Sequence, residues 1–169
     1  PYLGAGAPLL ANQQTAVFYP PNWLWLVLPG AQAMSFVAVV HVLWAGLGMW
    51  CFTGTLGFTP FGRGISALAY AFSGYLIARL GSFPTANAGA WIPWLFWLVQ
   101  RVLAQRRAPD VGWLGIAFGL QLLAGHAQTT WYGVVSVGLY ALWHTAWHMR
   151  RDRLQDRVHA LLAVGVGLL

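Results

Sequence analysis

Long apolar runs separated by short polar connections dominate the chain. A helix needs roughly 20 mostly apolar residues to cross about 30 Å of hydrocarbon. The pattern predicts an all-α, polytopic transmembrane helical bundle with about five full spans, a truncated sixth span and a short interfacial helix. The predicted spans cover about 31–56, 64–80, 90–107, 110–125 and 129–149, and the sixth begins near residue 154. The apolar stretch 22–29 is too short to span and is expected at headgroup level.

The chain divides into two predicted parts. Residues 1–30 form a loop that contains the short interfacial helix, and residues 31–169 form the transmembrane bundle. The first residue is Pro1, and the last stretch, "VHALLAVGVGLL", stops within an apolar run. We therefore expect this sequence to be an internal piece of a longer protein, with the bundle truncated at its end.

Composition supports the membrane class. Of the 169 residues, 59% are hydrophobic and only 7% are charged, whereas soluble domains carry about 25% charged residues. The net charge of +6 comes from arginines that lie between apolar runs, so it predicts topology rather than a nucleic-acid partner. Membrane lipid is the expected surrounding.

The arginines predict the orientation of the bundle. With alternating spans, eight of the nine fall on one side, and Arg79 alone falls on the other. The eight are Arg63, Arg101, Arg106, Arg107, Arg150, Arg151, Arg153 and Arg157. Because cytoplasmic loops are enriched in arginine, residues 1–30 and the loops "GSFPTANAGA" and "AGHAQTT" are expected to be extracytoplasmic.

The acidic residues restrict the chemistry. Asp110, Asp152 and Asp156 all fall in the predicted cytoplasmic loops, where a helix cap, at Asp110, and local ion pairs explain them. The outer face then has no carboxylate of its own. Acid–base catalysis or a divalent metal on that face would need an acid from outside this sequence, so no cofactor is assigned.

Polar and aromatic residues gather in the predicted outer loops. Amides, an imidazole and aromatic rings together can bind a sugar or a polar headgroup through hydrogen bonds and stacking. The candidate substrate-binding residues are Asn12, Gln13, Gln14, Tyr19, His126, Gln128 and Trp131. The simpler alternative for His126 is a helix cap or loop donor.

Arg79, the one arginine on the predicted outer side, lies near the outer end of the second span and is also a candidate substrate-binding residue. It either extends toward outer headgroups or binds an anionic group such as a lipid-linked phosphate, since guanidinium matches phosphate oxygens in a two-pronged way.

Three histidines lie within apolar runs. His41 is roughly 15 Å into the first span at 1.5 Å per residue, so it is a candidate for an interhelical hydrogen bond, a proton relay or an axial ligand to a pigment or haem. His144 and His148 have the i, i+4 spacing of a metal site. Their tryptophan and arginine neighbours favour an interfacial belt instead.

Five motifs, in order, resemble the YfhO-like family of bacterial membrane proteins, which are large polytopic proteins of the GT-C glycosyltransferase type. The motifs are "GAGAPLLANQQTAVFYPPNW", "VHVLWAGLGMW", "AYAFSGYL", "AWIPWLFW" and "LLAGHAQTTWY". The resemblance implies an N-proximal fragment of a multi-pass protein of the bacterial inner (cytoplasmic) membrane. It also implies transfer of a sugar from a polyprenyl-phosphate carrier at the extracytoplasmic face. The family's acidic residue would precede Pro1, so the catalytic residue remains unknown.

Two functions stay open. In the first, the chain is a fragment of such a transferase, with Arg79 at the carrier phosphate and the amides at the sugar. In the second, it is a non-catalytic accessory subunit that packs on other membrane subunits, lipids or pigments.

Overall fold

The computed structural model describes residues 11–105, 107–148 and 154–169, and this part of the chain is all helical, without strands. Residues 1–10 of the predicted outer loop and Arg106, Arg150, Arg151, Asp152 and Arg153 lie outside the described part. Within these ranges, two 3-10 helices and seven α-helices follow one another. They are η3 Gln13–Thr15, η4 Pro20–Leu26, α1 Gly30–Thr55, α2 Pro60–Ala71, α3 Gly74–Ala78, α4 Phe83–Gln105, α5 Ala108–Leu123, α6 Ala127–His148 and α7 Leu154–Gly167.

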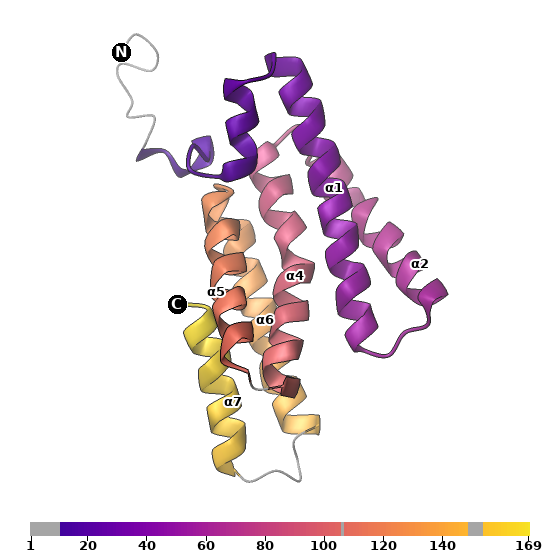
Figure 1. Cartoon of the computed structure of the whole chain (residues 1–169), viewed down its shortest axis with the longest axis vertical. Coiled ribbons are helices and arrows are strands. Elements are labelled where there is room, and N and C mark those ends of the chain that lie inside the picture. The colour runs from indigo at the N-terminus through magenta and orange to yellow at the C-terminus, as the bar shows by residue number, and fades with distance from the viewer. Residues whose placement is uncertain (1–10, 106, 149–153) are drawn as a thin grey trace.

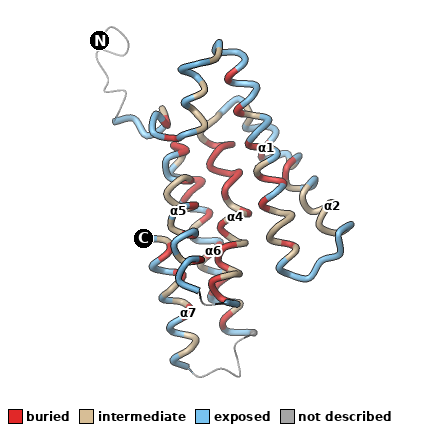
Figure 2. The backbone as a smooth tube through the Cα atoms, in the orientation of Figure 1, coloured by how far each residue is buried: buried red, intermediate tan, exposed pale blue. Residues whose placement is uncertain are grey.

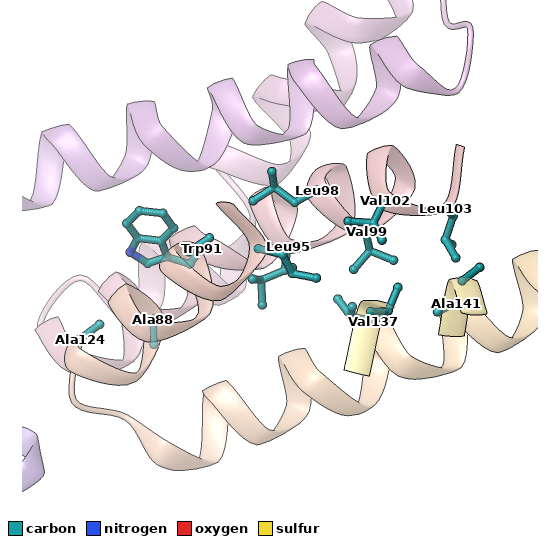
Figure 3. Close-up of a cluster of buried hydrophobic side chains, with 14 of the residues drawn as sticks. Ala88, Trp91, Leu95, Leu98, Val99, Val102, Leu103, Ala124, Val137 and Ala141 are labelled. Atoms are coloured by element: carbon teal, nitrogen blue, oxygen red, sulfur yellow. The ribbon is translucent and has the colours of Figure 1, made fainter. Parts of the chain in front are cut away.

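Helix α4 is the centre of the molecule. It packs against α1, α5 and α6, and Figure 2 shows it buried along most of its length while the outer sides of α1 and α2 are exposed. The main core joins α4 to α5, α6 and α7. In Figure 3, Leu95 and Val99 of α4 lie opposite Val137 and Ala141 of α6.

The predicted first span is confirmed as one continuous helix, since α1 covers 26 residues. The predicted second span is wrong as a single helix, because it is divided into α2 and α3. Ser73 causes the division: its side chain accepts a hydrogen bond from the backbone N–H of Leu76 and so begins α3 as an N-cap. The predicted third span begins earlier, at Phe83, and α4 continues through Pro93.

Among the described helices, α1 alone is both long and apolar enough to cross a membrane, rather than the five expected. Helix α5 is apolar but has 16 residues. Helices α4 and α6 have 23 and 22 residues, and their tryptophan, amide and histidine side chains lower the mean hydropathy. Helix α5 is therefore too short to meet the criteria for a membrane span, whereas α4 and α6 are long enough but not apolar enough.

Candidate functional site

The described cations lie at opposite ends of the bundle. Helix α1 descends in Figure 1, α2 and α3 return, and α4 to α7 then alternate in direction. One end therefore carries Arg63 in α2, Arg101 in α4, Arg107 before α5 and Arg157 in α7. Arg79 ends α3 at the other end, together with the segment 11–29 and the α5–α6 turn. This second end is called the ribbon end below.

Tyr19 and His41 lie in direct contact at the ribbon end, joined by Trp91 of α4. The Tyr19 hydroxyl lies 2.7 Å from Nε2 of His41, and the indole N–H of Trp91 donates to the Tyr19 oxygen at 2.8 Å. Nδ1 of His41 lies 2.7 Å from the carbonyl oxygen of Val37. The tyrosine and the histidine are 1% and 3% exposed. These contacts connect the N-terminal segment to both α1 and α4.

The contacts define the protonation state of this triad. A carbonyl oxygen can only accept, so Nδ1 of His41 carries the proton and Nε2 accepts from the Tyr19 hydroxyl. Burial raises the pKa of Tyr19, which keeps the phenol protonated as a donor. Both ring nitrogens of His41 are thus engaged within the protein, and neither is directed at a further ligand.

The N-terminal segment lies over the α5–α6 turn. The side-chain amide of Gln13 donates to the carbonyl oxygen of Leu122 at 3.5 Å, and Asn12 caps η3 through its side-chain oxygen. Gly125 has φ +92°, and a Cβ on it would lie 2.6 Å from the carbonyl oxygen of Gln13. Only glycine fits this combination of left-handed backbone and close approach.

His126 begins α6 rather than facing an open site. Its Nδ1 accepts from the backbone N–H of Thr129 at 3.1 Å and lies 2.7 Å from the Thr129 hydroxyl. The Tyr75 hydroxyl of α3 lies 3.1 Å from the same Thr129 oxygen. Because Nδ1 accepts, the proton of the neutral ring is on Nε2. The three side chains form a second polar cluster, connecting α3 to α6.

The other predicted residues stay separate. The Gln128 amide donates to the Tyr132 hydroxyl at 2.6 Å, one turn along α6, and Trp131 is 64% exposed. Arg79 is exposed, and its guanidinium has no ion pair with a described residue. The two hollows that Asn12, Gln13 and Gln14 line do not include His126 or Gln128, although all five residues lie at the ribbon end.

Two hollows flank the N-terminal segment. One, of about 420 Å³, contains Asn12 and Gln13. The other, of about 500 Å³, is lined by Gln14, Asn22, Trp23, Trp25 and Phe83, among others. The second hollow combines amides with indoles, and the rings of Trp25 and Phe83 meet edge to face at 6.0 Å.

Asn22, Trp23 and Trp25 were not among the predicted site residues. Their signal was one asparagine followed by two tryptophans at i, i+2 spacing in the predicted interfacial helix, here observed as η4.

Asp110 is not a helix cap, contrary to the prediction. Arg107 is the N-cap residue of α5, and Asp110 lies inside the first turn, 2.6 Å from the guanidinium of Arg101. Asp110 is 1% exposed, so the ion pair through Oδ1 offsets part of the lost solvation, while Oδ2 has no hydrogen-bond partner among the described residues. Asp156 lies in the first turn of α7, so both described carboxylates are at the arginine-rich end.

Metal-binding groups are not assembled in the described part. No three His, Cys, Asp or Glu side chains there come close enough to hold a metal ion. The side chain of His148 lies outside the described part, so its pairing with His144 stays a prediction.

Comparison with protein-family models, with curated proteins and with solved structures found no match for this chain. The residues and geometry of the ribbon end are therefore the basis for the functional argument.

Proposed function

We propose that the chain is part of a multi-pass membrane protein that binds a polyprenyl-phosphate-linked sugar at the ribbon end, as a fragment of a GT-C-like glycosyltransferase. The hollow of Gln14, Asn22, Trp23 and Trp25 supports this proposal most. A sugar offers hydroxyls that amides can bind and an apolar ring face that packs on an indole. Ligand pockets typically have such a mainly apolar lining with a few polar groups.

The outer surface supports the membrane placement. In the described part of the chain, large apolar side chains of several helices are exposed. They include Phe36, Leu43 and Leu47 of α1, Phe61, Ile65 and Leu68 of α2, and Leu139, Leu142 and Trp147 of α6. Soluble monomers rarely expose contiguous patches of this kind. In the proposal, α4 to α7 lie in the bilayer beside α1, and the ribbon end is extracytoplasmic because the opposite end carries most of the arginine.

The chain contributes binding rather than catalysis in this proposal. Both described carboxylates lie at the far end of the bundle, so the acid that activates the acceptor would come from another segment. Arg79 supplies the positive charge for the carrier phosphate. Its exposed guanidinium is suited to a diffusing anionic headgroup.

The binding half of the proposal can be tested by calorimetry on the purified chain in nanodiscs. We expect farnesyl phosphate to bind and farnesol, which lacks the phosphate, to bind much more weakly. Arg79→Ala should lower the affinity for farnesyl phosphate by about tenfold or more, which is the effect of losing one charge-assisted hydrogen bond. Arg157→Ala is the control, because it removes the same charge at the other end of the bundle and should leave this affinity unchanged.

Sugar recognition needs a second comparison. Farnesyl-phosphate-glucose should bind more tightly than farnesyl phosphate. Trp25→Ala should remove that difference while leaving the affinity for farnesyl phosphate unchanged. Equal binding of farnesol and farnesyl phosphate, or an unchanged affinity in Arg79→Ala, would overturn the assignment. The accessory-subunit alternative would then be favoured.

A further inference from the structure

A third hollow, of about 390 Å³, lies along the middle part of α4. Residues of α4 form its floor, Trp44 of α1 forms one wall, and Trp113, Ile116 and Leu120 of α5 form the other. Figure 1 shows α4 between α1 and α5 in this way. Along α4 the hollow extends from Trp91 to Arg101, ten residues or about 15 Å. It is called the tryptophan groove below.

Four indoles of the groove form a continuous array. Trp44 stacks on Trp94 with centroids 4.2 Å apart and meets Trp91 edge to face at 5.4 Å. Trp97 meets Trp94 at 5.5 Å. The array is held in position because the Trp94 N–H donates to the backbone oxygen of Trp44 at 3.0 Å. The groove is thus a preformed apolar channel.

One end of the groove is positively charged. Arg101 lies over the Trp97 ring at 5.0 Å, its guanidinium is fixed by Asp110, and its side chain remains 33% exposed. The exposed Arg107 precedes α5 by one residue. Arg107 does not line the groove, but with Arg101 it places two arginines against one carboxylate, Asp110, where α4 ends and α5 begins.

We propose that the tryptophan groove binds one tail of an anionic phospholipid, with its phosphate at Arg101. An elongated apolar channel fits a hydrocarbon tail, and the charge at its end fits a phosphate. Basic pockets between transmembrane helices at the cytoplasmic side bind anionic headgroups in this way. Ordinary helix packing explains Trp91 and Leu98, which are buried, but it does not explain the open space between α1 and α5.

This lipid site is distinct from the proposed carrier site. Its charged end, at Arg101, lies at the arginine-rich end of the bundle, whereas Arg79 and the two hollows beside the N-terminal segment lie at the ribbon end. The inference rests on the membrane placement in the proposed function but not on transferase activity, so the two can fail separately.

Native mass spectrometry of the delipidated chain, titrated with phosphatidylglycerol or phosphatidylcholine, tests the site. We expect one phosphatidylglycerol to bind at least about tenfold more tightly than phosphatidylcholine, a ratio that corresponds to about 1.4 kcal/mol. Ile116→Trp should fill the groove and abolish this preference. Ile65→Trp is the matched control, because Ile65 has the same 53% exposure on α2, outside the groove. Equal affinity for the two lipids, or full binding by Ile116→Trp, would overturn the proposal.

The headgroup contact has its own test. The double variant Arg101→Gln with Asp110→Asn removes both charges without leaving one buried alone, and it should lower phosphatidylglycerol binding to the phosphatidylcholine level. An unchanged preference would contradict a phosphate at Arg101.

Quenching in the wild-type protein provides a readout that needs no groove variant. At low mole fraction, brominated-tail phosphatidylglycerol should quench tryptophan fluorescence more than brominated-tail phosphatidylcholine. Equal quenching would contradict the site.

Discussion

At the residue scale, three side chains from distant parts of the sequence form one hydrogen-bonded chain. Trp91 donates to Tyr19, Tyr19 donates to His41, and His41 donates to the carbonyl oxygen of Val37. Every polar atom of this buried chain has a partner. A fully satisfied buried network rigidifies its surroundings, so these residues position the N-terminal segment on α1 and α4.

Tyr19→Phe tests this role. The substitution keeps the ring but leaves the Trp91 N–H and His41 Nε2 without a partner, and each buried unsatisfied group costs about 1–3 kcal/mol. We expect a clear loss of stability in detergent unfolding experiments. Tyr132→Phe is the control, since Tyr132 is exposed and its hydroxyl accepts from Gln128 one turn away, so the change should alter stability little. Equal stability of the two variants would show that the network does not hold the segment.

The sequence made His41 a candidate because of its depth in an apolar run, and Tyr19 because of its polar neighbours. Their contact could not be predicted, because it depends on how the segment 11–29 folds back over α1. Trp91 was missed for the same reason: one tryptophan among eleven carries no local signal that it is a hydrogen-bond donor. The sequence placed His126 at a helix end, and the structure shows it at the start of α6. There it acts as a cap, which was the simpler of its two predicted roles.

At the element scale, the N-terminal segment and the α5–α6 turn depend on each other. Gly125 allows the turn to be left-handed and allows the carbonyl oxygen of Gln13 to approach it. The five polar runs between helices were readable from the sequence, because they interrupt apolar stretches. The break between α2 and α3 could not be read from the sequence. It depends on one local hydrogen bond to the capping serine, and a serine at that position is also compatible with a continuous helix.

Gly125→Ala should detach the N-terminal segment from the turn. A side chain in the left-handed region costs about 1–2 kcal/mol, and the new Cβ would also collide with Gln13. We expect faster chymotrypsin cleavage after Phe18, read by mass spectrometry. Gly138→Ala provides the contrast: a Cβ there meets no atom within 4 Å, and alanine favours the helix by about 0.5–1 kcal/mol. Protection as complete as in the wild-type chain would contradict the proposed dependence.

At the scale of the whole molecule, charge and polarity are divided between the two ends of the bundle. The alternation of helix directions was predictable from the spacing of the apolar runs, and it places four described arginines together. The ion pair of Arg101 with Asp110 was not predictable in its geometry, because the pair joins α4 to α5. The tryptophan groove was also beyond the sequence, since it depends on the separation of α1 and α5 across α4.

The most direct test of the account is the sidedness of the bundle in a bacterial membrane. Gln128→Cys and Arg107→Cys, each in a Cys51→Ala background, place one exposed thiol at each end. In whole cells, a membrane-impermeant maleimide should label Gln128→Cys, and it should label Arg107→Cys only after permeabilisation. Labelling of both positions from the same side, or recovery of the protein in the soluble fraction, would contradict a bundle that crosses the membrane with its ribbon end outside.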